Sequence, residues 1–200
     1  MRLPHAEHFA HPWRIHEITE DFRVEDVWEL PTPGGPDDFG LLVDQFAAGD
    51  RPEQAPLATR ILFAIRWKLG ALFGWDEDGK GTGSRVQSLR DRLPADLRDG
   101  PRGPRLAAAD FKPLYLCEDE FAAEIANGTM QGVLHLGWVD AGDGTWLGQM
   151  TILVKPNGRK GELYMAAIKP FRYLIVYPQM LGRIERGWPG PLERAKPAPA

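Results

Sequence analysis

TMQGVLHLGWVDAGDGTWLGQMTILVK, residues 129–155, is the stretch that decides the fold. Apolar side chains alternate with polar or small ones in both halves, at Met130, Leu134, Leu136 and Trp138, and then at Trp146, Met150, Ile152 and Val154. Side chains of a β-strand point to opposite faces with a period of two, so each half predicts a strand with one apolar face. The intervening DAGDGT, residues 140–145, supplies residues that accept the positive φ angles of a hairpin loop. The stretch therefore predicts an antiparallel hairpin.

The residues before the hairpin predict further strands and several helices. Residues 111–126 alternate in character, and Asn127-Gly128 directly after them is a strong hairpin signal that leads into Thr129. We therefore interpret this segment as strand, although Phe121 and Ile125 would also suit a helix. Apolar spacing in the remaining segments predicts a strand at 13–18, a helical turn at 24–30, and helices at 39–49, 56–73 and 88–93.

Beyond the hairpin, the apolar period changes from two to that of a helix. From Glu162 onward apolar residues recur at intervals of three and four up to Ile184. Pro170 and Pro178 lie inside this pattern and must kink or divide the helix. A sheet followed by a terminal helix predicts an α+β fold, in which helices pack on one face of the sheet.

The length and composition of the chain fit one globular domain. The chain has 200 residues, of which 43% are hydrophobic and 26% charged, so a packed core can form. The net charge of -4 argues against an electrostatic nucleic-acid binder. Cys117 is the only cysteine, which excludes an intramolecular disulfide and, without a secretory signal, predicts a cytoplasmic protein. No apolar run reaches the length of a membrane span.

The two ends of the chain differ from its middle. Residues 1–12 carry His5, His8 and His11 between two prolines, and we expect a flexible terminus rather than a metal site. Residues 189–200 are rich in proline and alanine and predict a disordered tail. The predicted organisation is a flexible segment at 1–12, a single domain at 13–188 and a tail at 189–200.

Several sequence blocks together resemble a known family. These blocks are WRIHEI (13–18), DVWELPTPGGPDDF (26–39), RWKLG (66–70), SLRDRLP (88–94), EFAAEIANGTMQGVLHLGWV (120–139), LVKPNG (153–158) and YMAAIKPFRYLIVYP (164–178). In combination they are similar to the bacterial domain-of-unknown-function 2867 family, and they cover most of residues 13–188.

The resemblance implies a fold but no catalytic motif. It implies a helix-grip fold, similar to the START and birch-pollen-allergen (SRPBCC) superfamily, in which a curved antiparallel sheet wraps a long C-terminal helix and leaves a cavity between them. Pro170 and Pro178 depart from that plan, because they make the helix kinked rather than continuous. Some family members resemble C-terminal parts of proteins with a dinucleotide-binding domain, which implies such a protein, or a second copy of this chain, as a partner. This chain has no glycine-rich dinucleotide fingerprint of its own, and we expect no cofactor.

Few residues stand out as candidates for chemistry. His135 is the only histidine away from the N-terminal region, and its position opposite Leu134 and Leu136 makes it a weak catalytic candidate, with structural hydrogen bonding the commoner role for such a residue. The sequence shows no zinc spacing, nucleophile elbow or phosphate loop, so we expect no metal. As ligand-binding candidates we take polar residues of the sheet and of the terminal helix, namely Tyr115, His135, Gln149, Tyr164 and Tyr173.

Three classes of function remain open from the sequence. The first is a protein that binds a small hydrophobic molecule between the sheet and the C-terminal helix. The second is a cyclase- or hydrolase-like enzyme that uses His135 with a nearby tyrosine or glutamate. The third is a non-catalytic interaction or accessory module, for which the seven tryptophans are a weak indication. Hydrogen-bonded polar groups inside the cavity would favour the enzyme, whereas a dry apolar lining would favour the carrier.

Overall fold

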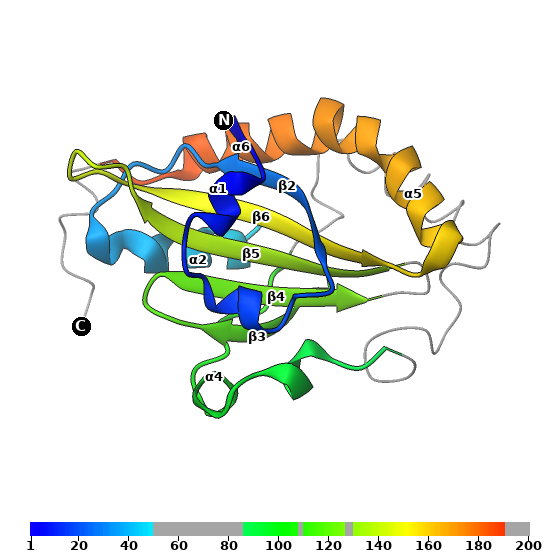
Figure 1. Ribbon diagram of the computed structural model, residues 1–200. Coiled ribbons are helices and arrows are strands. Elements are labelled where there is room, and N and C mark those ends of the chain that lie inside the picture. Colours follow the sequence, from blue (N-terminus) through cyan, green and yellow to red (C-terminus); the bar gives the residue numbers. More distant parts are fainter. Residues whose placement is uncertain (50–85, 108–109, 127–129, 191–200) are drawn as a thin grey trace.

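The chain folds into an antiparallel sheet with helical segments on both faces (Figure 1). The computed structural model describes residues 1–49, 86–107, 110–126 and 130–190. The strands follow the order β1-β2-β6-β5-β4-β3, and every neighbouring pair is antiparallel. They are β1 (Arg2–Leu3), β2 (Arg23–Glu29), β3 (Lys112–Leu116), β4 (Glu120–Ala126), β5 (Met130–Asp140) and β6 (Trp146–Pro156).

The helices divide between the two faces of this sheet, so the expectation of helices on one face is wrong. Short elements precede and follow β2, namely α1 (Ala6–Phe9), the 3-10 helices η1 (Arg14–Glu17) and η2 (Pro36–Asp38), and α2 (Phe39–Ala47). The 3-10 helix η3 (Leu89–Arg92) and α4 (Ala95–Asp99) lead into β3. After β6 comes a continuous but bent helical segment, made of α5 (Gly158–Phe171), the π-helix η4 (Arg172–Val176) and α6 (Tyr177–Gly187).

The hairpin predicted from residues 129–155 is the centre of the sheet, as expected. β5 and β6 pair along eleven positions, from Met130 opposite Pro156 to Asp140 opposite Trp146. Gly142 and Gly144 in the connecting loop have φ angles of 87° and 83°, which explains the glycines there. The strands predicted within residues 111–126 are also confirmed as β3 and β4.

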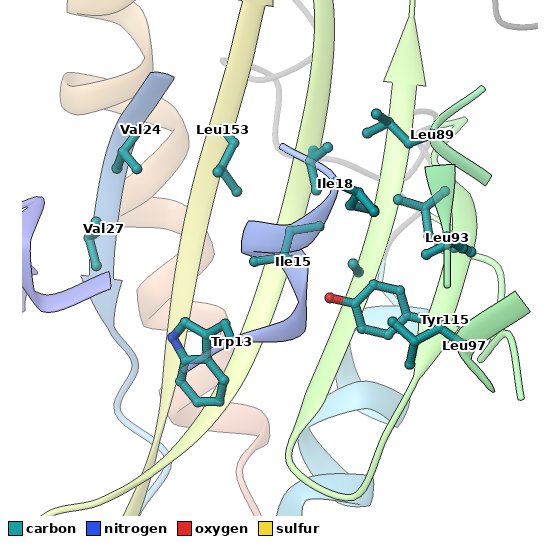
Figure 2. Packing of buried hydrophobic residues seen from close by; sticks show 13 residues of the cluster. Trp13, Ile15, Ile18, Val24, Val27, Leu89, Leu93, Leu97, Tyr115 and Leu153 are labelled. Atoms are coloured by element: carbon teal, nitrogen blue, oxygen red, sulfur yellow. The ribbon is translucent and has the colours of Figure 1, made fainter. Parts of the chain in front are cut away.

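Each face of the sheet has its own apolar core. One core contains Val133 and Leu153 and is covered by η1, η3 and α4; Figure 2 looks onto this face, with the C-terminal helix behind the sheet. The other core contains Leu134 and Met150 and is covered by α2 and the C-terminal helical segment. Because successive residues of a strand point to opposite faces, odd positions of the central hairpin serve the first core and even positions the second.

Two expectations for the first thirty residues are wrong. Residues 13–18 contain η1 rather than a strand, because the carboxylate of Glu120 accepts hydrogen bonds from the backbone N–H groups of Arg14 and Ile15. Residues 24–30 contain β2 rather than a helical turn. A shift in register between Val24 and Asp26 places Val24 and Val27 on the same face, so a strand with a bulge imitates helical spacing.

The segment before Trp13 is also ordered, contrary to the expectation of a flexible terminus. Leu3 pairs with Val27 in the sheet, and α1 follows directly. His8 is fully buried and lies with its Nδ1 3.1 Å from Thr151 Oγ1. The burial of His8 on β6 supplies the anchor that the sequence pattern does not reveal.

The remaining helix predictions have different outcomes. Helix α2 confirms the prediction at 39–49, and η3 confirms the short helix at 88–93, with the Ser88 hydroxyl accepting a hydrogen bond from Arg90 N. The predicted kinked C-terminal helix is confirmed by α5, η4 and α6. The predicted helix at 56–73 and the predicted tail after residue 190 lie outside the described residues.

Candidate functional site: an apolar cavity under the bent helix

A cavity of about 370 Å³ lies between the sheet and the C-terminal helical segment. Its floor consists of side chains from β4, β5 and β6, and its roof of side chains from α5, η4 and α6. Further residues come from α2 and from the segment before β3. The lining includes Gln45, Gly132, Arg172 and Tyr177, and the methionines Met130, Met150, Met165 and Met180.

The floor of the cavity follows from the alternation of the central hairpin. Leu134, Met150, Ile152 and Val154 all occupy even positions, so they point towards the C-terminal helix. Gly132 lies among them without a side chain, and a Cβ there would be 3.2 Å from Met130 Sδ. The missing side chain therefore leaves this part of the floor to the flexible thioether of Met130, which a Cβ would crowd.

The bend in the roof has an identifiable cause. Pro170 lies inside α5, where it cannot donate a backbone hydrogen bond, and the helix continues through the five-residue π-helix η4. This path brings Tyr173 and Tyr177 onto Asp26, with both hydroxyls donating hydrogen bonds to its carboxylate and Tyr177 Oη at 2.6 Å. Asp26 is fully buried on β2, so the bend is tied directly to the sheet.

The carboxylate of Asp26 lies beside the guanidinium of Arg172 and the carboxylate of Glu25. Burial raises the pKa of the Asp26 carboxyl, although the Tyr177 hydroxyl and the Arg172 guanidinium oppose that shift. Arg172 Nη2 lies 2.8 Å from Glu25 Oε1 and 3.5 Å from Asp26 Oδ2. Burial, followed by the neighbouring Asp26 charge, raises the pKa of Tyr177. The Tyr177 hydroxyl therefore stays protonated and acts as a donor.

Several polar groups of the lining have partners in the protein, whereas Gln45 Oε1 and Arg172 Nε are buried without one among the described residues. Arg172 is paired with Glu25 and Asp26, and the Tyr177 hydroxyl is bound to Asp26. Gln45 donates from Nε2 to the carbonyl of Ile184 at 2.9 Å. The surface that remains for a ligand is mainly hydrocarbon and thioether, which is the composition of a small-molecule site for apolar compounds.

A second group of polar side chains lies on the opposite face of the sheet. The carboxylate of Glu120 accepts hydrogen bonds from Tyr115 Oη and from the N–H groups of Arg14 and Ile15, and its Oε1 lies 3.0 Å from His135 Nε2. His8 packs against His135, with ring centroids 5.2 Å apart. This polar cluster, Glu120 with Tyr115, His135 and His8, is covered by η1 and α1.

Burial controls the proton affinities of the polar cluster. Burial, followed by the nearby His135 and His16 rings, lowers the pKa of His8 to about 3 against the opposing charge of Glu120. For Glu120 itself burial acts to raise the pKa, but hydrogen bonds from His135 and Tyr115 outweigh burial and leave the pKa below its usual value. Burial, with the Glu120 charge, raises the pKa of Tyr115 well above its usual value.

The polar cluster has the groups of an acid–base site but is closed. A carboxylate beside an imidazole and a phenol is an arrangement that can move protons. Glu120 is 2% exposed, while Tyr115 and His135 are fully buried, and Trp13 packs on the His135 ring with centroids 5.3 Å apart. Its hydrogen bonds join η1 to β3, β4 and β5, so the geometry is that of a structural network.

The predicted ligand-binding residues do not form one group in the structure. Tyr115 and His135 meet at Glu120, and Gln149 lies on the same face, 4% exposed, with no hydrogen-bond partner for its Oε1. This face lies away from the cavity. Tyr173 is on the cavity side but donates to Asp26, and the side chain of Tyr164 in α5 is outside the described part of the structure.

Sequence reasoning missed the residues that line the cavity. Four of the five methionines of the chain do so, at Met130, Met150, Met165 and Met180. Their positions on the even face of the hairpin and on the inner face of the helix were readable from periodicity. Polar candidates were preferred instead, because polar groups carry most recognisable chemistry.

Comparison with known proteins adds a family but no activity. The sequence model of a family described as "Protein of unknown function (DUF2867)" matches residues 18–179. No curated protein matches the chain, and no solved structure does. Within the part of the chain that the structure describes, no cluster of three or more His, Cys, Asp or Glu side chains could hold a metal ion, and no helix is long and apolar enough to cross a membrane.

Proposed function

The chain belongs to the DUF2867 family of unknown function, and we propose that it binds a small hydrophobic molecule in the cavity between its sheet and its bent C-terminal helix. The observation that carries the proposal is an apolar cavity of about 370 Å³, within the range of ligand sites in proteins. An empty apolar space of this size costs stability, because its walls lose packing contacts. A bound apolar molecule would restore those contacts.

The distribution of polar groups favours a binding protein over an enzyme. Glu120, His135 and Tyr115, the groups suited to acid–base chemistry, belong to the polar cluster on the face away from the cavity. A ligand in the cavity would meet the even-numbered side chains of β5 and β6 instead. A cyclase- or hydrolase-like activity that uses His135 would need the N-terminal segment to leave the sheet.

The cellular location of the protein and its protein partners stay predictions. The single cysteine, Cys117, is a free thiol, which agrees with a cytoplasmic protein. The outer face of the C-terminal segment exposes Leu163 and Leu174, at 72% and 77%. Exposed apolar side chains of this kind suit contact with another protein, and the partners we propose are a second copy of the chain or a dinucleotide-binding protein.

Native mass spectrometry of freshly purified protein tests the proposed function. The expected result is a discrete additional mass that disappears on denaturation and is recovered in an organic extract. Gly132→Leu should abolish it, because the new side chain fills the floor of the cavity next to Met130. Gly40→Leu is the matched control, since a Cβ at Gly40 meets nothing within 4 Å. An additional mass that Gly132→Leu retains unchanged would place the ligand elsewhere.

A further inference from the structure

We propose that the ligand is a flexible, unbranched aliphatic chain that lies extended along the C-terminal helix, an inference that rests on the proposed function. Three features of the cavity carry it: its shape, the flexible methionine side chains of its lining and the small number of lining polar atoms that lack a partner in the described part of the chain. Each restricts the class of molecule that can fill it.

The cavity is long in one direction. On the helical side its lining runs from Met165 to Ile184, a path of about 28 Å at the usual helical rise. On β6 the lining runs from Met150 to Val154, about 13 Å along the strand, and at the Ile184 end it continues onto Gln45 of α2. A volume of about 370 Å³ distributed along such a path makes a narrow channel rather than a rounded chamber. An extended chain fits a channel better than a fused-ring compound does.

The lining side chains can adapt to a chain of variable conformation. Met130, Met150, Met165 and Met180 contribute to both the floor and the roof. Methionine is unbranched and polarisable, and it adjusts its shape to irregular apolar partners at little cost. A site that must hold one rigid shape would need stiffer walls, whereas methionines suit a flexible chain and tolerate differences in its length.

The polar lining residues leave two buried atoms without a partner from the residues that the structure describes, Gln45 Oε1 and Arg172 Nε, which suit a single polar end group of a ligand. The Tyr177 hydroxyl is bound to Asp26, the Arg172 guanidinium is paired with Glu25 and Asp26, and the Gln45 amide N–H₂ is bound to the Ile184 carbonyl. A ligand with several polar groups would bury some of them without partners, which is costly. A hydrocarbon chain with one polar end group avoids that cost and can supply a partner to Gln45 Oε1 or Arg172 Nε.

Binding of two ten-carbon alcohols separates a channel from a chamber. The probes are 1-decanol, which is a chain, and cyclodecanol, which is a compact ring, measured by equilibrium dialysis on the full chain. Each association constant is divided by the compound's octanol–water partition coefficient. The corrected constant of 1-decanol should exceed that of cyclodecanol at least about tenfold, because the ring cannot follow the channel. From 1-octanol to 1-decanol the affinity should rise about threefold to fourfold per methylene.

Two variants test the role of the methionines in the same assay. Met165→Ile places a stiff β-branched side chain in the roof and should weaken 1-decanol about threefold to tenfold. Leu163→Ile changes an exposed residue of the same helix and should leave the affinity unchanged. The comparison of the two alcohols uses wild-type protein, so it does not depend on whether either variant folds.

The outcomes distinguish the inference from the function on which it rests. Equal or tighter binding of cyclodecanol would overturn the chain-shaped channel while leaving a hydrophobic ligand site intact. Unchanged 1-decanol affinity in Met165→Ile would overturn the role given to that methionine. Failure of both alcohols to bind would overturn the channel and the proposed function together.

Discussion

Glu120 and Glu124 lie four residues apart on β4 and cap two different 3-10 helices from the same face of the sheet. Glu120 accepts the backbone N–H groups of Arg14 and Ile15 at the start of η1. Glu124 accepts the N–H of Leu89 at 3.0 Å and the hydroxyl of Ser88 at the start of η3. Both carboxylates are almost fully buried, at 2% and 1% exposure. One strand thus positions two covering segments, each through a buried glutamate that caps a 3-10 helix.

Removal of the Glu120 charge should destabilise the protein without affecting ligand binding. Glu120→Gln replaces one acceptor oxygen by an amide N–H₂ that faces other donors, and we expect a loss of about 2–3 kcal/mol in the free energy of unfolding. Tyr115→Phe removes only one of the hydrogen bonds to Glu120 and should cost about 1–2 kcal/mol. Urea denaturation measures both, and wild-type stability of Glu120→Gln would contradict the structural role of the polar cluster.

The stability of the protein should fall with pH below about 6.5. Because the pKa of His8 is about 3 in the folded protein and near 6.5 when unfolded, the unfolded state takes up a proton first as the pH falls. The stabilisation is therefore complete above pH 6.5 and is lost towards pH 3. Burial also lowers the pKa of His16, which acts in the same direction. The pKa of Glu120 is also lowered in the folded protein, so a further loss of stability begins as the pH falls to its usual pKa of about 4.5.

The variant His8→Phe isolates the contribution of His8 to this pH dependence. Between pH 6 and pH 4 the unfolding free energy of wild type should fall more steeply than that of the variant, by about 1 kcal/mol per pH unit. Urea denaturation at several pH values gives both slopes, and the difference in slope is independent of any loss of packing caused by the new ring. Parallel pH profiles would show that His8 is not protonated on unfolding in this range.

A methyl group at Gly137 should displace the N-terminal segment. A Cβ there would lie 2.6 Å from Cζ2 of Trp13, which packs against the sheet at this point, and we expect overpacking to cost about 1–3 kcal/mol. Gly40→Ala is the control, because its Cβ enters open space in α2 and should stabilise the helix by about 0.5–1 kcal/mol. Opposite shifts of the two urea midpoints are expected; equal shifts would show that the close contact at Trp13 relaxes freely.

Loss of Asp26 should release the bent part of the C-terminal helix. Asp26→Ala leaves the tyrosine hydroxyls of η4 and α6 without their acceptor and removes one partner of the half-buried Arg172, so a loss of about 3 kcal/mol is expected. Tyr173→Phe removes a single hydrogen bond and should cost about 1 kcal/mol. Amide hydrogen exchange should become faster in η4 (Arg172–Val176) for Asp26→Ala. Unchanged exchange there would mean that the bend is held by Pro170 alone.

The parts of the fold that depend on local periodicity were predictable from the sequence. The hairpin β5–β6 and the kinked terminal helix follow from alternation, from the loop glycines and from Pro170. The parts that depend on distant partners were not. η1 forms where its N–H groups meet Glu120, more than a hundred residues away, and β2 carries a bulge that mimics a helical period.

The candidate residues were harder to predict than the fold. A general preference for polar groups selected Tyr115 and His135, which the structure brings together at Glu120 on the closed face. The cavity is instead lined by methionines and by Gly132, whose contribution is the absence of a side chain. Neither feature has a recognisable motif, because an apolar binding site needs space and flexibility rather than a fixed arrangement of reactive atoms.

The division of the sheet into two faces has a consequence for how substitutions along β5 would be tolerated. A saturation-mutagenesis map of this strand should alternate residue by residue. His135 and Gly137 pack against η1 and the N-terminal segment, so substitutions there would reduce the amount of folded protein. Gly132 and Leu134 border the cavity, so proteins with larger apolar residues there would still fold but would bind different ligands. Neighbouring codons of one strand would thus report on two separate phenotypes, abundance and ligand selectivity.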